Sequence, residues 1–233
     1  MESIDKVNGT FGKKTNESKS DVSSAVIRRL PRYHRCLGDL IRAGELRISS
    51  AELAKIMGVT ASQIRQDLNC FGGFGQQGYG YNIKFLYNKI SELLGVNEGF
   101  NAVIIGAGNL GSALAATHMF ERRGVNRLAM FDVNPKLVGT KIYNVPVLHI
   151  DELYDFCITN NVHIGVLTVP KEAAYNITET LIKAGIKGIW NFANMEIKLD
   201  TPGVIVENIH LGDSLMALCY EIKTKNSSGD ENV

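Results

Sequence analysis

Three glycines at a fixed spacing, followed by an acidic residue, form the pattern in this chain that best predicts a chemical function. The segment VIIGAGNLGSALA carries Gly106, Gly108 and Gly111 in the order G-x-G-x-x-G, and Asp132 lies 21 residues beyond the last glycine. An apolar segment precedes the glycines and a helix-forming segment follows them. Strand, glycine turn, helix and a later acidic residue together predict a dinucleotide site.

Each residue of this pattern has a separate expected role. Gly106 permits a tight turn, Gly108 lets a pyrophosphate approach the backbone, and Gly111 lets helix and strand pack closely. The free N–H groups at the start of the helix face the phosphates. Asp132 accepts hydrogen bonds from the ribose hydroxyls and repels a 2′-phosphate, which predicts NAD(H) rather than NADP(H). The alternative role for Asp132 is structural, as a strand-end residue that caps the turn at Asn134.

The segments after the glycines alternate between apolar strands and amphipathic helices. NVHIGVLTVP, IKGIWNFA and GVIVEN are predicted strands, and KEAAYNITETLIKAG is a predicted helix. This alternation predicts an α/β, Rossmann-like doubly wound parallel sheet with its ligand at the carboxyl ends of the strands. The loops at 168–170 and 191–193 then border the nicotinamide. The predicted cofactor-binding residues are Gly106, Ala107, Gly108, Asn109, Leu110, Gly111, Asp132, Thr168, Val169, Pro170, Asn191 and Phe192.

Three helices are predicted in front of this domain. The first begins near residue 24, with Pro31 near its start and Gly44 at its end. Ser49 or Ser50 caps the second, whose apolar face holds Leu53, Ile56 and Met57. The third begins at the capping residue Thr60 and turns Ile64, Leu68 and Phe71 inward.

Two helices joined by the short turn at residues 58–60 form a helix-turn-helix, and the following FGGFGQQGYGYNI predicts a hairpin wing. The outward face of the third helix carries Arg, Gln and Asn, which suit the edges of guanine and adenine. This is a winged helix-turn-helix prediction. The predicted DNA-binding residues are Thr60, Ser62, Gln63, Arg65, Gln66, Asn69, Tyr79 and Gly80.

Charge supports this interpretation. Residues 28–90 contain ten Lys or Arg against four Asp or Glu, a net charge of +6, whereas residues 99–225 contain eleven against twelve. Arg and Lys provide affinity for phosphates, and the outward face of the third helix provides specificity. The alternative that remains is a plain helical dimerisation module.

The predicted domains are a disordered tail at 1–22, a winged-helix DNA-binding domain at 23–95, a Rossmann NAD(H)-binding and dimerisation domain at 96–225, and a disordered tail at 226–233. Cys36, Cys70, Cys157 and Cys219 are dispersed, without metal or redox spacing, and are expected to be reduced and at least partly buried. No segment has the length or apolarity of a membrane span or a secretory signal, so a cytoplasmic location is expected.

The last predicted helix, IHLGDSLMALCYEIK, carries an apolar stripe of Leu211, Leu215, Leu218 and Ile222. No later segment remains to cover it. The stripe packs either on its own domain or on a second subunit.

Together these segments resemble the Rex family of redox-sensing transcriptional repressors. The resemblance covers about residues 24 to 224 and is carried by RRLPRYHRCL, TASQIRQDL, GYGY, GAGNLGSALA, FDVNPKLVGT, TVPKEAA and AGIKGIWNFA. It implies a homodimer in which the C-terminal helix is exchanged between subunits. It also implies a repressor that binds double-stranded operator DNA when NADH is scarce and leaves it when NADH binds. Cofactor contacts are implied at residues 106, 108–111 and 132, and a recognition helix at 60–71.

Some positions depart from the family pattern. The recognition helix has Gln66 where Lys is usual, the wing has Gln76 and Gln77 where basic residues are common, and Asn194 replaces a Pro. Fewer cationic side chains predict weaker or less salt-dependent DNA binding.

The residues at the family's switch positions also differ. A Tyr, an Asp and an Arg are common there, and this chain has Thr117, His210 and Arg35. An Asp–Arg attraction cannot form from His210. These differences predict a divergent member that binds the nucleotide with weakened coupling to DNA.

Two other functions remain open at this stage. An NAD-dependent oxidoreductase needs an acid or base near the nicotinamide, and His118, His149, His163 and His210 are isolated in sequence. Residues 168–192 are also similar to the nucleotide domain of acyl-CoA ligases, which would bind CoA. Asp132 argues against CoA, because a carboxylate repels a 3′-phosphorylated ribose. The sequence predicts no metal site, no catalytic residue, no membrane partner and no protein partner other than a second copy.

Overall fold

The structure is a computed structural model of the 233-residue chain and describes residues 22–71, 75–76, 79–199 and 201–229. The chain divides into two compact units, Met1–Leu94 and Gly95–Val233. This boundary lies one residue before the one predicted at 95/96. Most of the predicted N-terminal tail, residues 1–21, lies outside the described residues.

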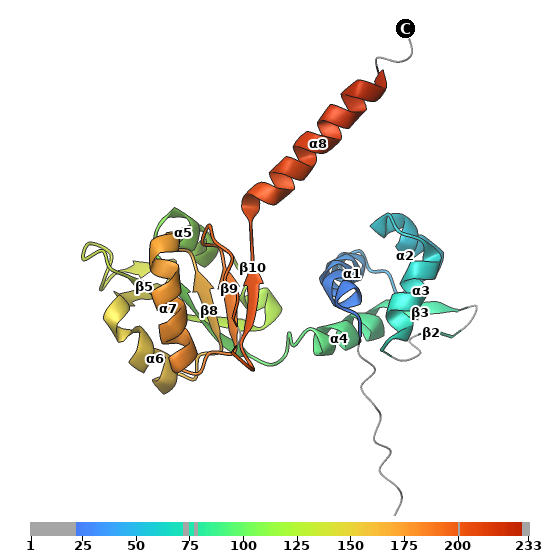
Figure 1. The fold of residues 1–233 in the computed structure, drawn as a ribbon. Helices are drawn as coiled ribbons and strands as arrows, with labels where there is room; N and C mark the ends of the chain where they lie inside the picture. Colours follow the sequence, from blue (N-terminus) through green and yellow to red (C-terminus); the bar gives the residue numbers. More distant parts are fainter. Residues whose placement is uncertain (1–21, 72–74, 77–78, 200, 230–233) are drawn as a thin grey trace, which may run out of the picture. The chain divides into compact units, whose positions relative to one another are not determined.

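The first unit is a helical bundle with a small antiparallel sheet (Figure 1). Its described elements are α1 (Ser24–Arg42), β1 (Arg47–Ile48), α2 (Ser50–Met57), α3 (Ala61–Asn69), β2 (Gly75–Gln76), β3 (Gly80–Asn82) and α4 (Ile83–Leu93). Strand β3 pairs with both β1 and β2 in antiparallel fashion. The predicted winged helix-turn-helix is therefore confirmed, with β2 and β3 as the wing. The wing residues 72–74 and 77–78, which include the predicted departure at Gln77, are outside the described set.

Local sequence signals fix the helix-turn-helix. Ser49 caps α2, and its side chain and that of Glu52 bond to each other's backbone N–H in a capping box. Gly58 ends the helix with φ of 66°, a left-handed conformation that glycine adopts without strain. Thr60 then caps α3 by accepting a hydrogen bond from the N–H of Gln63.

Two expectations for the first unit are wrong. Ile56 is 57% exposed, and Ala54 takes its place in the core. At about 100° per residue, Leu53, Ala54 and Met57 share one side of α2 and Ile56 points away from it. Pro31 lies inside α1 rather than near its start. Its ring leaves the carbonyl of Ile27, a residue on the exposed side, without the usual helical N–H partner.

The second unit is built on one twisted sheet. Its described elements are β4 (Phe100–Ile105), α5 (Asn109–Ala116), η1 (Glu121–Arg123), β5 (Val125–Asp132), β6 (Lys141–Ile142), β7 (Val145–His149), η2 (Ile150–Glu152), α6 (Leu153–Thr159), β8 (Ile164–Leu167), α7 (Lys171–Lys183), β9 (Gly188–Asn191), β10 (Ile205–Asn208) and α8 (Leu211–Gly229). The strand order is β10-β9-β8-β4-β5-β7-β6, parallel except for β6. In chain order the parallel strands run 3-2-1-4-5-6, which confirms the doubly wound prediction.

Helices cover both faces of this sheet. Val103 and Ile105 of β4 join the cluster that contains Leu153 of α6 and Leu181 of α7. Ile104, the residue between them, joins the opposite cluster with Ala115 of α5. From β4 the chain adds β5 and β7 on one side and then β8, β9 and β10 on the other, so the strand order reverses between β4 and β8. Ligands bind at this switch point in such sheets.

The terminal helix α8 leaves the sheet after β10 (Figure 1). Its residues Leu211, Leu215, Leu218 and Ile222 are between 51% and 63% exposed. The apolar stripe therefore does not pack on the described part of its own chain. The helix also continues to Gly229, into the segment 226–229 that was expected to be disordered. Once a helix is nucleated, each added residue costs little, and no Pro or Gly interrupts this one between Gly212 in its first turn and Gly229.

Candidate functional sites

The glycine turn after β4 has the geometry that the sequence predicts. Gly106 has φ of 99°, and a Cβ there would lie 2.7 Å from the carbonyl oxygen of Thr168. A Cβ on Gly111 would overlap the carbonyl oxygen of Gly106. Larger residues at either position would push the turn away from β8 or from α5. Both glycines are therefore required by the fold itself, whether or not a ligand is present.

Gly108 differs from the other two glycines. A Cβ built on it meets no atom of the protein within 4 Å, and its φ of −72° and ψ of −166° suit any residue. It is the N-cap of α5, and no side chain caps that helix. The free N–H groups that begin at Asn109 and Leu110 can bind an anion. The open space at Gly108 leaves room for one.

Asp132 ends β5 beside the glycine turn. Its Oδ2 accepts a hydrogen bond of 2.6 Å from the N–H of Ala107, and its Oδ1 accepts one of 2.8 Å from the N–H of Asn134. The structural role considered for Asp132 is therefore present. Each carboxylate oxygen has a second lone pair, so Asp132 can still accept hydrogen bonds from two ribose hydroxyls.

The loop after β8 lies against the glycine turn. The hydroxyl of Thr168 lies 2.9 Å from the carbonyl oxygens of Ile105 and Gly106, so it bonds the two loops across the switch point. Val169 is half-buried, and Pro170 is exposed as the N-cap of α7.

The loop after β9 is held by Asn191. This side chain is fully buried, donates to the carbonyl of Met195 and to Asn208 Oδ1, and accepts from the N–H of Ala193. The structure thus gives Asn191 a supporting role. Phe192, which is half-buried and stacks edge-on against Trp190, remains the candidate for ligand contact in this loop.

The third helix presents a polar face. Ser62, Arg65, Gln66 and Asn69 are exposed, as predicted. They line a groove of about 870 Å³ between α3 and the start of α1. The Nη1 of Arg65 donates to the hydroxyl of Ser50, 3.1 Å away, which holds the guanidinium near the start of α2.

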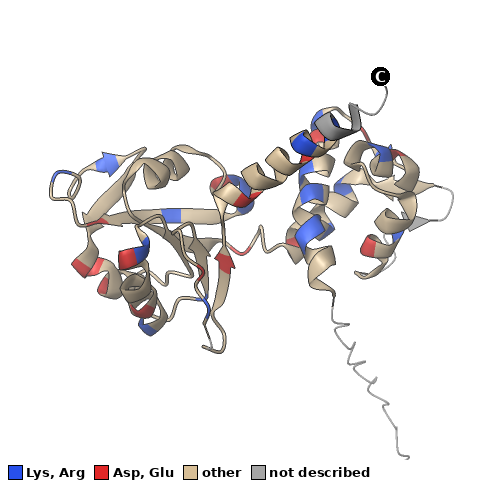
Figure 2. Ribbon diagram, turned by 45° about the horizontal axis from the view of Figure 1, so that its top comes forward, with Lys and Arg blue, Asp and Glu red and all other residues tan. Residues whose placement is uncertain are grey.

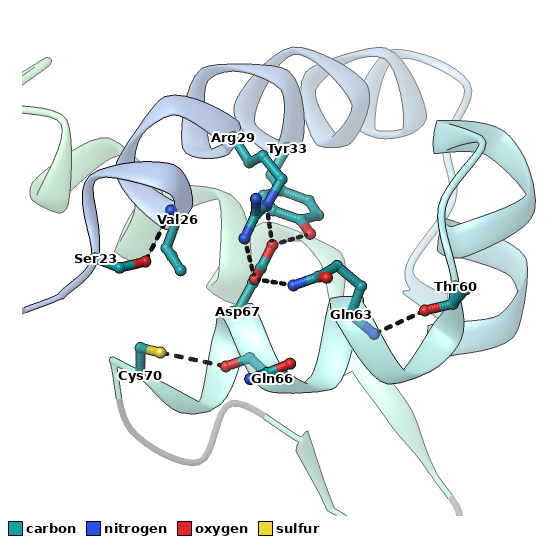
Figure 3. A network of polar contacts seen from close by, with 9 residues as sticks. All are labelled: Ser23, Val26, Arg29, Tyr33, Thr60, Gln63, Gln66, Asp67 and Cys70. Atoms are coloured by element: carbon teal, nitrogen blue, oxygen red, sulfur yellow. Dashed lines mark hydrogen bonds and ion pairs between the residues drawn. The ribbon is translucent and has the colours of Figure 1, made fainter.

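Asp67 is a residue of α3 whose importance the sequence analysis missed. Its side chain is completely buried and joins α3 to α1 (Figure 3). Arg29 donates from Nε at 2.6 Å and from Nη2 at 2.7 Å, and Tyr33 donates its hydroxyl at 2.7 Å. Gln63 donates from Nε2 at 2.7 Å. The predicted DNA contact Gln63 is therefore half-buried and bonded within the protein.

These hydrogen bonds set the charge of the network. Burial raises the pKa of Asp67, but the hydrogen bonds from Arg29, Tyr33 and Gln63 outweigh it, and the pKa lies below its ordinary value. Burial and the bond to Asp67 raise the pKa of Tyr33 above its ordinary value. At neutral pH the network therefore holds an ionised Asp67 and a neutral Tyr33.

Among the described residues of the wing, Tyr79 has an exposed aromatic side chain. Tyr79 is 71% exposed, and its carbonyl accepts a hydrogen bond from Arg47. Gly80 has φ of 69°, and a Cβ there would lie 2.7 Å from the carbonyl oxygen of Ile48. The approach of β3 to β1 alone therefore requires glycine at position 80.

Basic side chains gather on the first helix. Figure 2 shows Lys and Arg along α1, which carries Arg28, Arg29, Arg32, Arg35 and Arg42. Among the described residues, no cluster of His, Cys, Asp and Glu could hold a metal ion, and no helix could cross a membrane.

Two of the four histidines considered as catalysts accept hydrogen bonds from backbone N–H groups. His163 Nδ1 accepts a hydrogen bond from the N–H of Asn101, and His149 Nδ1 accepts one from the N–H of Asp151. Cys157 is buried, and burial raises the pKa of its thiol to about 11, which makes it a poor nucleophile. All four cysteines are free thiols. The expectation that all are at least partly buried is wrong, because Cys70 at the C-cap of α3 and Cys219 on α8 are exposed.

The residues at the family's switch positions are exposed. Thr117 is the exposed C-cap of α5, and its hydroxyl donates to the carbonyl of Leu114. His210 is exposed just before α8, and Arg35 is exposed on α1.

Comparison with known proteins identifies the family. A model described as a putative DNA-binding protein N-terminus matches residues 21–69, and one described as a CoA binding domain matches residues 97–195. The redox-sensing transcriptional repressor Rex of Caldanaerobacter subterraneus is 52% identical over 88% of this chain and 91% of its own length. The chain belongs to the Rex family. The Rex repressor of Clostridium botulinum (strain Hall) is 51% identical over 90% of this chain and its whole length.

Solved Rex structures have the same fold. The Rex-family repressor RSP, in complex with beta-NAD+ and operator DNA, has a TM-score of 0.84 and 50% identity over 91% of this chain and 97% of RSP. RSP in complex with beta-NADH has a TM-score of 0.82 and 47% identity over 91% of this chain and the whole of RSP. Rex proteins are transcriptional repressors rather than enzymes, which argues against the oxidoreductase alternative.

Proposed function

We propose that this Rex-family chain is a homodimeric transcriptional repressor that senses the NADH/NAD+ ratio. It binds operator DNA when NADH is scarce and leaves the DNA when NADH binds. The observation that carries the proposal is the combination, in one chain, of a winged helix-turn-helix with a doubly wound sheet whose strand order reverses between β4 and β8. Support comes from RSP, which matches nine-tenths of the chain and is known with beta-NAD+ and operator DNA and with beta-NADH.

Within this function, residues 23–95 bind DNA and residues 96–225 bind NAD(H) and dimerise. The pyrophosphate lies over Gly108 at the start of α5, where no protein atom lies within 4 Å of the Cβ position. Asp132 holds the adenosine ribose through the free lone pairs of its carboxylate. Phe192 and the loop of Thr168, Val169 and Pro170 border the nicotinamide.

The nucleotide is NAD(H) rather than CoA. The family model that matches residues 97–195 is described as a CoA binding domain, so both nucleotides need testing. The carboxylate of Asp132 lies beside the glycine turn, where the adenosine ribose binds in this fold, and it would repel the 3′-phosphate of CoA. Calorimetric titration with NADH, NAD+ and CoA ranks the three directly.

The dimer is supported by α8. Its stripe of four leucine and isoleucine residues is exposed along the helix, and a continuous apolar surface of this kind marks an association site. A partner subunit covers it in the dimer. The cytoplasm is the proposed location, because operator DNA and the NADH pool meet there.

The deciding experiment is a gel shift of the full-length protein. The probe is a duplex selected by the protein from a randomised pool, with NAD+ or NADH added. We expect salt-sensitive binding that persists with NAD+ and is lost with NADH. Failure to select any sequence, together with turnover of a hydroxy or carbonyl substrate, would refute the repressor.

A second candidate is a divergent repressor that binds NADH with weakened release of DNA. Thr117 and His210 favour it, since neither supplies the group that is common at its position in the family. This candidate predicts NADH binding by calorimetry without full release in the gel shift. Complete release by NADH would refute it.

A further inference from the structure

The buried carboxylate of Asp67 fixes the orientation of a neighbouring side-chain amide. Asp67 Oδ1 accepts from Arg29 Nη2 and Gln63 Nε2, and Oδ2 accepts from Arg29 Nε and Tyr33. An ionised carboxylate has no proton to donate. The group of Gln63 that faces it must therefore be the NH2 group, and the carbonyl oxygen Oε1 must point elsewhere.

The carbonyl oxygen of Gln63 is accessible. Oε1 has no hydrogen-bond partner among the described residues, and no buried polar side-chain atom in that part of the chain lacks a partner. Oε1 is therefore exposed to solvent. Nε2 keeps one hydrogen beyond the one it gives to Asp67. Figure 3 shows the amide nitrogen of Gln63 directed at Asp67. Gln63 also lines the groove that Arg65, Gln66 and Asn69 line, so the acceptor Oε1 and the second Nε2 hydrogen stand in a fixed order beside that groove.

This pair of groups suits one purine. Gln63 is the third residue of α3, and in a helix-turn-helix the N-terminal residues of the second helix contact base edges. In the major groove adenine offers a donor at N6 and an acceptor at N7, whereas guanine offers acceptors at both O6 and N7. A carbonyl oxygen fixed toward the base matches the amino group of adenine and repels O6 of guanine.

We propose that Asp67 is a positioning residue for base readout, which holds the amide of Gln63 so that it selects adenine over guanine at one position of each operator half-site. Asp67 itself contacts no DNA. The inference rests on the proposed DNA-binding function and adds to it a residue that determines specificity from inside the protein.

The test compares the base preferences of full-length variants by selection from a randomised duplex pool without added NADH. The wild type is expected to prefer adenine over guanine about tenfold at one half-site position, the discrimination of one bidentate contact. Gln63→Met should remove that preference and leave the other positions unchanged. Asp67→Asn should reduce it to about twofold at the same position, because an Asn amide can donate or accept and lets Gln63 turn over.

Tyr33→Phe is the matched control. It removes a hydrogen bond from Oδ2 of the same carboxylate, while Gln63 is bonded to Oδ1. It should therefore lower stability and keep the preference for adenine. If Asp67→Asn weakens binding to all duplexes equally, with the same preferred base, Asp67 is merely structural and the proposal is wrong. If the wild type selects no sequence, the proposed function fails first, which is a distinguishable outcome.

A second measurement does not depend on the folding of Asp67→Asn. The measurement is NMR of the wild type, in which the side-chain NH2 resonances of Gln63 are assigned by their absence in Gln63→Met. The proton that bonds to the carboxylate should keep its downfield chemical shift when the selected duplex is added. Loss of the hydrogen bond from Gln63 to Asp67 on DNA binding would overturn the proposal.

Discussion

Replacement of Gly108 by alanine separates the binding of the nucleotide from the stability of the fold. The added Cβ meets no protein atom within 4 Å, and the backbone of Gly108 is in an extended conformation that alanine adopts freely. Loss of chain entropy in the unfolded state contributes about 0.4–1 kcal/mol in favour of alanine. Alanine is a poorer N-cap than glycine by about the same amount. The two effects nearly cancel, and Tm should change by less than about 2 °C.

The affinity for the nucleotide, unlike the stability, should change. The methyl group would occupy the space in which the pyrophosphate approaches the N–H groups of α5. Loss of one hydrogen bond to a charged group costs about 1.5–3 kcal/mol, which raises the Kd for NADH roughly 10- to 150-fold. Calorimetry gives the Kd, and differential scanning fluorimetry gives Tm. Gly111→Ala is the control, because its Cβ would overlap the carbonyl oxygen of Gly106 and should cost about 1–3 kcal/mol, or roughly 2–12 °C in Tm. An unchanged Kd in Gly108→Ala would show that the pyrophosphate does not lie over this glycine.

Three further predictions concern the two units. Arg65→Ala should reduce operator affinity at least tenfold while the Kd for NADH stays the same, since Arg65 lies in the first unit and the nucleotide site in the second; equal operator affinity in a gel shift would remove α3 as the recognition helix. Leu215→Asp combined with Leu218→Asp should give a monomer in light scattering, because the charges fall within the exposed stripe of α8; a persistent dimer would exclude that stripe from the interface. The pKa of Asp67 is lowered from an ordinary value of 3.8, so its contribution to stability is complete above that pH and is lost as the pH falls through the lower folded value. The free energy of unfolding of the first unit, measured with urea, should therefore fall below about pH 4, and it should fall less in Asp67→Asn. An equal fall in both proteins would contradict this.

The glycine turn was predictable from its spacing, but only part of its requirement is local. Gly106 is required by its approach to Thr168, 62 residues away, a contact that the sequence does not show. Gly111 is required by a local contact, because its Cβ would overlap the carbonyl oxygen of Gly106 within the same strand–turn–helix segment. The helix caps at Ser49 and Thr60 were predictable for the same reason. Their partners lie within three residues.

Asp67 was missed because its main partner, Arg29, lies 38 residues away. One signal was available: at helical spacing Asp67 shares the inward face of Ile64 and Leu68, and a carboxylate among buried apolar residues needs a cationic partner. The sequence showed several arginines in the first helix but could not select one. The same limit applies to Asn191, whose bonds to Met195 and Asn208 depend on how the loops pack.

The hydrogen bond between Ala107 and Asp132 has a consequence for how the two forms of the coenzyme are distinguished. It ties the segment that we propose for the diphosphate to the carboxylate that we propose for the ribose, so the adenylate half of the proposed site is preorganised before any ligand arrives. NAD+ and NADH are identical in that half. In the proposed site their discrimination therefore originates at the opposite end, near Thr168 and Phe192, where a planar cationic ring and a neutral puckered one would meet different surroundings.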